Sequence, residues 1–358
     1  MFDLPDYSPG CLLVTGASGF LGRAVVSQAK ARGWNVRATS RRRGELPADV
    51  DFHSASIIDP KALERTVRGA DAVIHCAGLA HVTDRGSTAE ALFYRVNRTG
   101  TENVVRAAVE AGVRRIVIVS SVAVYGHSAT VCDEDSPCRP NSAYGQSKFE
   151  GERRAAEIAH RSGVLLTILR PATLYGEGAP GNVARLIRAI DRRRFIWLGR
   201  GENRKTLVHV EDAARACLLA IAKMPAGLNV YNVSSPSVTM RHIVEALAHA
   251  LGKQPPRWHI PAWLARRGAW MAGRLLSGAG LFRSLENTID KWLCDDVFSG
   301  TKIERELGFV PQVDLADGLR RQVQAYRGLA GPSVPRPHAW GHRQTPNHPA
   351  PRATWKTF

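Results

Sequence analysis

Short apolar runs alternate with longer amphipathic stretches along the first half of the chain. The runs have the length of buried strands, and the stretches between them repeat apolar residues with helical spacing. Parallel strands are joined by helical crossovers that cover both faces of the sheet, so such strands are apolar throughout. The pattern therefore predicts an α/β fold with a doubly wound parallel sheet. We expect strands near 11–15, 35–39, 72–75, 116–120 and 165–169, and helices over 89–111 and 143–161.

A glycine-rich turn follows the first expected strand and opens a helix. Gly16, Gly19 and Gly22 are spaced three residues apart. Glycines at these positions allow a tight turn and a close approach of the backbone to a diphosphate, and the helix N-terminus adds free N–H groups and a positive dipole. The alternative is a tight turn that binds nothing. The strand–turn–helix context near the start of an alternating chain favours a dinucleotide-binding site.

The end of the second strand indicates which nicotinamide cofactor binds. An acid there hydrogen-bonds the ribose 2′-hydroxyl of NAD, whereas an arginine favours the 2′-phosphate of NADP. Here Ser40 is followed by Arg41, Arg42 and Arg43, with no acid. We therefore expect NADP(H) to be favoured, with Arg41 at the phosphate, and NAD(H) as the alternative. If this turn binds no cofactor, the three arginines are a solvated basic turn.

Three residues with complementary chemistry follow the strand expected at 116–120. Ser121 lies just past its end, where ligands bind in open α/β sheets, and Tyr144 and Lys148 are spaced i, i+4 on one helix face. An ammonium beside a phenol lowers a pKa that starts at about 10. Tyr144 can then give or take a proton at an alcohol or sugar oxygen held by Ser121. This arrangement predicts general acid–base catalysis beside a hydride donor rather than an exposed helix face.

Eight short segments match one known family as a set: Thr15–Gly22, His75–Gly78, Val96–Thr101, Ser120–Gly126, Tyr144–Lys148, Arg170–Gly176, Leu207–Asp212 and Lys302–Phe309. Over roughly residues 10–328 the chain resembles the extended short-chain dehydrogenases/reductases of the NAD-dependent epimerase/dehydratase family. Within that family it is most similar to bacterial UDP-N-acetylhexosamine 4-epimerases and 4-keto-6-deoxy-sugar 4-reductases of polysaccharide biosynthesis. The resemblance implies a Rossmann-type sheet, a nicotinamide cofactor, a nucleotide-sugar substrate and a homodimer.

The resemblance also implies a role for each matching residue. Ser121, Tyr144 and Lys148 are the catalytic set, and Lys148 also holds the nicotinamide ribose. The cofactor-binding residues are Gly16, Ser18, Gly19, Phe20, Leu21, Gly22, Ala77, Asn97 and Pro171. The diphosphate of the substrate is implied to meet Asn182 and Arg204 or Lys205, whose structural alternatives are a helix cap and a solvated basic turn.

The chain departs from the family pattern in three places. Ser56 and Ile57 stand where an acid usually contacts the adenine, so one adenine contact is lost or replaced. Lys205 stands where an arginine is usual. Val122 and Ala123 replace the Asp–Glu pair that dehydratases carry after the active-site Ser or Thr. Because removal of water across two sugar carbons needs an additional acid and base, we do not expect a dehydratase.

The regular alternation weakens after about Gly176. We expect residues 10–176 to form the dinucleotide-binding core, and 177–328 mainly a smaller substrate-binding domain with elements that return to the core. Residues 329–358 are rich in proline and basic residues and too poor in apolar residues to build a core, so we expect a disordered tail.

The composition excludes several classes of protein. With 44% hydrophobic and 23% charged residues the chain is neither disordered throughout nor a collagen or coiled coil. No apolar run approaches the roughly 18 residues of a membrane-spanning helix, and the acidic start does not resemble a secretory signal. Six scattered cysteines without a Cys-x-x-Cys unit, and histidines without ligand spacing, predict no disulfide scaffold and no metal site. We expect a cytoplasmic protein.

The net charge of +17, from 49 basic and 32 acidic residues, favours anionic partners. Pro261–Leu285 combines tryptophans and leucines with arginines and no acid. It is read either as a buried helix of the substrate domain or as a basic amphipathic helix that touches an anionic membrane, which would place the protein at the inner face of that membrane. The tail lacks the aromatic platforms of nucleic-acid binding, so no nucleic acid is expected.

These observations predict an NAD(P)-dependent oxidoreductase that acts on a UDP-linked (N-acetyl)hexosamine, as a 4-ketoreductase or a 4-epimerase. The alternative substrate is an apolar alcohol of the hydroxysteroid kind, and a further alternative is a dinucleotide-binding protein without turnover. Ser40 and Ser56 replace two acids that hold the dinucleotide. A cofactor held less firmly exchanges at every turnover, so we expect net reduction of a 4-keto sugar.

Overall fold

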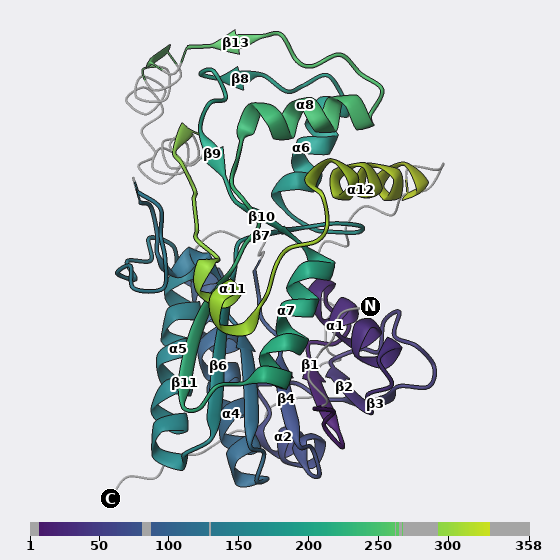
Figure 1. Cartoon of the computed structure of the whole chain (residues 1–358), viewed down its shortest axis with the longest axis vertical. Helices are drawn as coiled ribbons and strands as arrows, with labels where there is room; N and C mark the ends of the chain where they lie inside the picture. Colours follow the sequence, from purple (N-terminus) through teal and green to yellow (C-terminus); the bar gives the residue numbers. More distant parts are fainter. Residues whose placement is uncertain are drawn as a thin grey trace, which may run out of the picture.

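A seven-stranded parallel sheet forms the centre of the computed structural model, which describes residues 7–80, 87–128, 130–261, 263–264, 267 and 293–329 (Figure 1). The strand order is β11-β6-β5-β4-β1-β2-β3, and every neighbouring pair is parallel. The chain runs outward from β1 to β3 and returns on the other side of β1, so the sheet is doubly wound as predicted. The strands are β1 (Leu12–Thr15), β2 (Val36–Ser40), β3 (Asp51–Ser54), β4 (Ala72–His75), β5 (Arg115–Val119), β6 (Leu165–Pro171) and β11 (Leu228–Val233).

Helices cover both faces of this sheet. They are α1 (Phe20–Ala31), α2 (Pro60–Val67), α4 (Gly100–Glu110), α5 (Ala143–Ser162) and α7 (Val210–Lys223). Successive strand residues point to opposite faces, so Leu12 and Val14 pack with α1 and α7, whereas Leu13 packs with α2, α4 and α5. This two-sided burial explains why the strands are apolar at every position.

The helix predicted over 89–111 is interrupted by a π-helical turn. It consists of α3 (Ser87–Phe93), the π-helix η1 (Tyr94–Thr99) and α4. The wide turn lies against α5, where a Cβ added to Gly151 would come within 2.5 Å of the Asn97 carbonyl oxygen. Single π turns inside helices frequently occur at functional sites.

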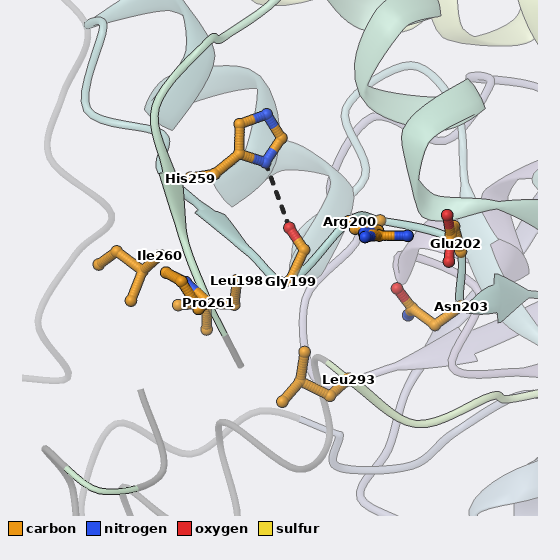
Figure 2. A pocket seen from close by; sticks show the side chains of 10 residues that line it. Leu198, Gly199, Arg200, Glu202, Asn203, His259, Ile260, Pro261 and Leu293 are labelled. Carbon is orange, nitrogen blue, oxygen red and sulfur yellow. Dashed lines mark hydrogen bonds between the residues drawn. The ribbon is translucent and has the colours of Figure 1, made fainter. Parts of the chain in front are cut away.

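A second apolar cluster lies above the sheet in Figure 1. It is built from α6 (Asn182–Asp191), α8 (Met240–Ala250) and α12 (Leu315–Leu329). Three short strand pairs complete this part: β7 (Thr173–Tyr175) with β10 (Leu207–His209), β9 (Arg204–Lys205) with β12 (Val238–Thr239), and β8 (Trp197–Leu198) with β13 (His259–Ile260). A cavity of about 760 Å³ opens beside β8 and β13 (Figure 2). The cluster corresponds to the smaller domain expected after residue 176, whose boundary stays a prediction.

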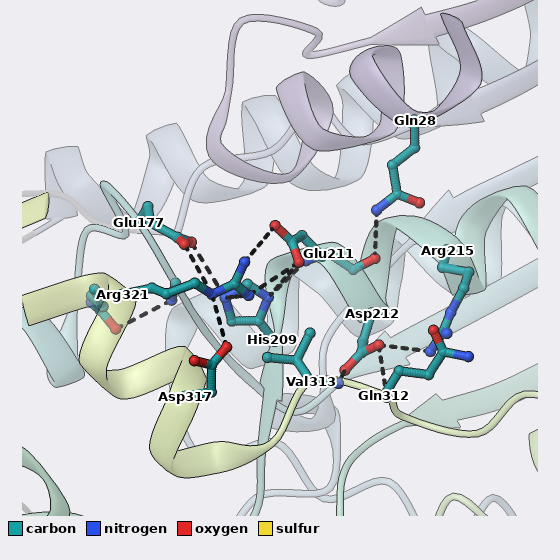
Figure 3. Close-up of polar contacts among 12 residues, drawn as sticks. Gln28, Glu177, His209, Glu211, Asp212, Arg215, Gln312, Val313, Asp317 and Arg321 are labelled. Carbon is teal, nitrogen blue, oxygen red and sulfur yellow. Dashed lines mark hydrogen bonds and ion pairs between the residues drawn. The ribbon is translucent and has the colours of Figure 1, made fainter. Parts of the chain in front are cut away.

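The C-terminal segment is fastened to α7 by buried and partly buried charges (Figure 3). The buried carboxylate of Asp212 accepts hydrogen bonds from the N–H groups of Gln312 (3.0 Å) and Val313 (3.1 Å). Arg321 of α12 forms an ion pair with Glu211 at 3.1 Å. These contacts hold residues 312–321, which are distant in sequence, against α7.

The same segment also crosses back to the loop between β5 and α5. The N–H of Cys132 donates to the Val297 carbonyl (2.9 Å), and the N–H of Ser299 donates to the Cys132 carbonyl (2.8 Å). The segment then continues into α11 (Thr301–Leu307), which packs beside β11. Backbone hydrogen bonds between residues far apart in sequence therefore hold the Cys132 loop and residues 297–299 side by side.

Two expectations concern residues that lie outside the described part of the chain. One is the disordered tail at 329–358, of which only Leu329 is described, and the other is the helix at 261–285, most of which is not described. In the part of the chain that the structure describes, no helix is long and apolar enough to span a bilayer.

Candidate active site

The glycine turn joins β1 to α1 and is shaped by close backbone contacts. A Cβ on Gly16 (φ +67°) would lie 2.5 Å from the Ala77 nitrogen, and a Cβ on Gly22 would lie 2.2 Å from the Gly16 carbonyl oxygen. Gly19 is the N-cap of α1, with no side-chain cap, and the first turn of the helix carries no acid. This cradle and the open helix N-terminus fit an anionic diphosphate. Ser18 lies in the turn, and Phe20 and Leu21 begin the helix.

The basic residues after β2 have different surroundings. The Arg43 guanidinium donates to the Pro47 and Ala48 carbonyls at 2.7 and 2.9 Å, so it holds its own loop together. Arg41 is exposed, one residue past the end of β2. Because β2 is the neighbour of β1, Arg41 lies at the edge of the glycine turn, where the sequence predicts the 2′-phosphate.

The loop after β4 is held by Asn97 of η1. Its side chain is buried, accepts from the Leu79 N–H (2.8 Å) and donates to the Leu79 carbonyl (2.9 Å) and the Ser147 hydroxyl (3.0 Å). Asn97, which lies within the wide π turn, therefore ties the loop at Leu79 to α5.

His75 at the end of β4 is a packed core residue. It is fully buried, with Nδ1 2.6 Å from the Thr15 hydroxyl and Nε2 3.1 Å from the Thr101 hydroxyl. Burial and the nearby charge of Lys148 lower the pKa of His75 to about 3, so its imidazole is neutral. His81, a second candidate near this loop, lies outside the described residues.

Ser121 and Tyr144 meet where α5 begins beside the short helix η2 (Val122–Val124). Ser121 is the N-cap of η2, where its hydroxyl accepts the Ala123 N–H at 3.2 Å, and it lies close enough to the Tyr144 phenol to affect its pKa. The close approach depends on Gly145, where a Cβ would lie 2.5 Å from the Ala123 carbonyl oxygen. The structure thus brings together two of the three predicted catalytic residues.

Lys148 lies one turn further along α5 and is buried. Its ammonium donates to the Val119 carbonyl at 2.6 Å and faces Gly78, where an added Cβ would be 3.5 Å away. The catalytic helix is therefore connected to the glycine turn through Gly78 and the adjacent Ala77. Burial lowers the pKa of Lys148 to about 8, and Glu152 opposes this shift.

The expectation that Lys148 lowers the pKa of Tyr144 is wrong for this arrangement. Burial raises the pKa of the Tyr144 phenol, and the nearby side chain of Ser121 opposes the shift only in part. The Lys148 ammonium is instead directed to the Val119 carbonyl. Tyr144 consequently rests as a neutral phenol that is able to donate a proton.

A buried hydrogen-bond network around Arg170, which the sequence analysis missed, lies behind Tyr144 and Lys148 on α5. The guanidinium of Arg170 forms two hydrogen bonds with the Glu152 carboxylate, at 3.0 and 2.6 Å, and one with the Tyr125 hydroxyl at 2.9 Å. The Tyr125 hydroxyl in turn donates to Asn232 of β11 at 2.8 Å. The i, i+4 spacing of Lys148 and Glu152 was the available signal, because it places a carboxylate one turn behind the catalytic lysine.

The candidates on the substrate side are more dispersed. Asn182 is exposed at the first position of α6, whose N-cap is Gly181, so its side chain is not the cap. The exposed Arg204 donates to the Ser237 hydroxyl and carbonyl at 3.1 and 3.0 Å. Lys205 is buried and paired with Asp296 at 2.6 Å. Pro171 is buried at the end of β6. Arg204 is therefore better placed than Lys205 to meet a phosphate.

The glycine turn, the Ser121–Tyr144 pair and Lys148 together match one protein family. The model of the family described as "NAD dependent epimerase/dehydratase family" matches residues 12–234. The chain belongs to this family. It is accordingly an NAD-dependent enzyme of the epimerase/dehydratase type, and the predicted resemblance is confirmed.

Several members of the epimerase/dehydratase family are similar over nearly their whole length. An N-acetyl-α-D-glucosaminyl-diphospho-ditrans,octacis-undecaprenol 4-epimerase of Escherichia coli O157:H7 is 31% identical over 317 residues, which cover 87% of this chain and 94% of the relative. A 4-hydroxy-2-methyl-3-oxo-4-farnesyl-3,4-dihydroquinoline-1-oxide ketoreductase of Stigmatella aurantiaca is 30% identical, with 89% and 96% covered. The solved structure of MoeE5 in complex with UDP-glucose and NAD is 28% identical, with a TM-score of 0.69 and coverage of 89% and 99%.

Proposed function

We propose that this enzyme transfers a hydride at C4 of a UDP-linked N-acetylhexosamine, as a 4-ketoreductase or a 4-epimerase in surface-polysaccharide biosynthesis. The observation that carries the proposal is the close approach of α5 to η2 at Gly145, which brings Tyr144 to Ser121, together with Lys148 facing Gly78 beside the glycine turn. The UDP-glucose and NAD bound by MoeE5 support the substrate and cofactor classes. Val122 and Ala123 at the positions of the dehydratase acids speak against elimination of water.

In this proposal Ser121 holds the C4 oxygen of the sugar and Tyr144 exchanges a proton with it. A bound nicotinamide dinucleotide supplies or accepts the hydride at C4. Lys148, buried and hydrogen-bonded to the Val119 carbonyl, would hold the nicotinamide ribose of the bound dinucleotide, as the family resemblance implies. The raised pKa of Tyr144 keeps the phenol protonated at rest, which is the form that a proton donor to a 4-keto oxygen needs.

The cofactor side of the proposal favours NADP(H). Arg41 lies exposed past β2 and no acid competes for the ribose. Ser40 donates its hydroxyl proton to the Arg42 carbonyl at 2.5 Å, so it is already engaged in the turn. Loss of the ribose acid and of the adenine-edge acid at Ser56 supports a cofactor that exchanges during turnover, whereas the 4-epimerase name of the Escherichia coli relative supports one that is retained.

One experiment separates these two reactions. The purified protein is denatured and the released nucleotide quantified, and fresh enzyme is incubated with UDP-N-acetylglucosamine and with its 4-keto-6-deoxy derivative. A cofactor-free protein that consumes one NADPH per keto sugar supports the reductase. Stoichiometric bound NAD, with epimer formation in the absence of added cofactor, assigns the epimerase instead.

An apolar alcohol is the second candidate substrate. The name of the Stigmatella aurantiaca relative, a ketoreductase of a farnesylated quinoline, favours it. Thermal unfolding in the presence of UDP, dTDP, GDP and a sterol distinguishes the classes, because a ligand that binds only the folded state raises the unfolding temperature. Stabilisation by the sterol alone would contradict the nucleotide-sugar proposal. Stabilisation by dinucleotide alone, with no turnover of any substrate, would indicate a binding protein.

A further inference from the structure

The two-stranded ribbon of β8 and β13 turns apolar side chains outward at the end of the molecule farthest from the large sheet (Figure 1). Trp197 and Leu198 pair with His259 and Ile260, so Ile196 is the register neighbour of Trp258. Because side chains alternate along a strand, Ile196, Trp258 and Ile260 share one side of the ribbon.

Of the four residues of β8 and β13, Trp197 is buried, Leu198 is half-buried, and His259 and Ile260 are exposed. Trp197 is buried and its ring stacks on that of His259 at 5.9 Å, on the side that faces the second apolar cluster. On the other side Trp258 is 80% exposed and Ile196 49% exposed. Trp263, shortly after β13, is 63% exposed. An isolated exposed leucine needs no explanation, but a large apolar set gathered on one ribbon marks an interaction surface.

The cavity beside the ribbon continues this apolar surface. Figure 2 shows Ile260 on the opposite side of β13 from the His259 ring, which lies 3.3 Å from the Gly199 carbonyl oxygen. Leu198, Ile260 and Leu293 line the cavity, and Arg200 adds a cation to its wall. The apolar surface of the ribbon therefore extends to the rim of this cavity.

The segments that form the ribbon are basic, although Glu202 lines the cavity beside Arg200 and Asp191 forms an ion pair with Lys253. Residues 192–200 and 252–261 contain no acidic residue. Tryptophan favours the boundary between hydrocarbon and water, and arginines beside it attract anionic headgroups. The exposed arginines that flank the ribbon are Arg192, Arg193, Arg194, Arg200 and Arg257.

From these observations we infer that the outward side of the β8–β13 ribbon docks on an anionic phospholipid bilayer. The apolar side chains enter the headgroup boundary and the flanking arginines contact the lipid phosphates. The catalytic residues lie on other elements, so this surface recruits the enzyme to the membrane without a part in hydride transfer. The inference is independent of which substrate the enzyme uses.

Vesicle sedimentation with the full-length protein tests this inference. Vesicles contain either phosphatidylcholine alone or phosphatidylcholine with phosphatidylglycerol. The Trp258→Ser/Ile260→Ser and Arg193→Gln/Arg194→Gln variants are compared with Val131→Ser/Val310→Ser, which removes exposed apolar side chains elsewhere. We expect binding to the anionic vesicles only, weakened about 10- to 30-fold in both ribbon variants and unchanged in the control. Thermal unfolding and dinucleotide binding verify that each variant is folded.

Four outcomes would overturn the inference. They are no binding to anionic vesicles, equal binding to neutral ones, binding that survives both ribbon variants, and an equal loss in the Val131→Ser/Val310→Ser control. Size-exclusion chromatography adds a fifth, because a ribbon variant that converts a dimer to a monomer, without vesicle binding by the parent protein, would show that the surface is covered by a second copy of the chain.

Discussion

At the scale of single residues, burial determines the resting state of the catalytic pair. Tyr144 is more difficult to ionise than a free phenol and Lys148 is easier to deprotonate than a free amine, and desolvation is the main cause of both shifts. Both pKa shifts favour the neutral form of the group, the phenol of Tyr144 and the amine of Lys148. Proton transfer at the sugar oxygen therefore begins from a neutral phenol beside Ser121.

Replacement of Tyr144 tests its role in proton transfer. Tyr144→Phe removes only the transferable proton, so we expect kcat to fall by about 10²–10⁴-fold while dinucleotide affinity is retained. Lys148→Met is expected to reduce both, because it removes the charge near the phenol and the predicted ribose contact. Steady-state kinetics and dinucleotide titration measure the two effects. Tyr326→Phe on α12 is the matched control, and near-normal activity of Tyr144→Phe would refute the assignment.

Arg41 tests the choice of cofactor. Arg41→Asp replaces the expected partner of a 2′-phosphate with a repulsive charge, so the Kd for NADP should rise by more than the Kd for NAD. A charge-assisted hydrogen bond contributes about 1.5–3 kcal/mol, which corresponds to roughly 10- to 150-fold in Kd. Arg42→Asp, one exposed residue further on, controls for the net charge. Equal effects on the two dinucleotides would place Arg41 outside the ribose pocket.

His75 gives the stability a defined pH dependence. Its pKa is about 3 in the folded protein, against 6.5 for the unperturbed side chain. Between these values only the unfolded chain binds the proton, so the free energy of unfolding decreases as the pH falls below 6.5, by about 1.4 kcal/mol per pH unit. Urea unfolding from pH 7 to 5 should show a steeper slope for the parent protein than for His75→Gln. Identical slopes in the parent protein and in His75→Gln would contradict the prediction.

Sequence alone predicted the residues whose function depends on local spacing. The glycine turn and the Tyr144–Lys148 pair lie within one turn or one helix, where spacing fixes geometry. The partner of Lys205 was not predictable, because Asp296 is brought to it by the fold and not by any local pattern. The direction of the Tyr144 pKa was also missed, since it depends on burial and on where the Lys148 ammonium points.

At the scale of elements, α5 is positioned by two close backbone approaches. Gly145 lets its first turn reach η2, and Gly151 lets its middle reach η1. Apolar periodicity predicted α5 to within one residue, yet it did not reveal the π turn, because one extra residue hardly disturbs the helical repeat over 89–111. The π turn that carries Asn97 could therefore not be predicted from the sequence and was found only in the structure.

The ion pair between α5 and β6 provides an element-scale prediction. Glu152 and Arg170 are both buried, so Glu152→Gln leaves the guanidinium charge without its counter-charge. We expect a loss of about 3 kcal/mol in the free energy of unfolding, because breaking a buried pair leaves an uncompensated charge. Glu157→Gln breaks the exposed pair with Arg154 on the same helix and should cost less than about 1 kcal/mol. Chemical denaturation measures the free energy of unfolding of both variants. Equal losses would mean that the buried pair contributes no more to stability than the exposed pair.

At the scale of the whole molecule, the C-terminal segment closes the structure. Asp212→Ala removes the acceptor of the Gln312 and Val313 N–H groups, so we expect a loss of about 2–4 kcal/mol from donors left without a partner. Trypsin should then cleave within α12 faster than in the parent protein. Asp317→Ala, which removes an exposed ion pair with Arg320, serves as the control. Unchanged cleavage in Asp212→Ala would show that α12 is held by apolar packing alone.

The crossing of residues 294–299 over the loop at Cys132 has a consequence for biosynthesis. A nascent chain that has reached residue 176 already contains the glycine turn, Ser121, Tyr144 and Lys148, but the loop after Ser121 still lacks its backbone partners and Lys205 has not been made. At about 5–20 residues per second, the roughly 120 residues up to position 300 take about 6–25 seconds to synthesise. During that interval the dinucleotide-binding core at residues 10–176 can begin to fold, while the loop at Cys132 is still without its hydrogen-bond partners. The enzyme is therefore expected to acquire its cofactor site on the ribosome first, and its substrate site only after residue 299 has been made.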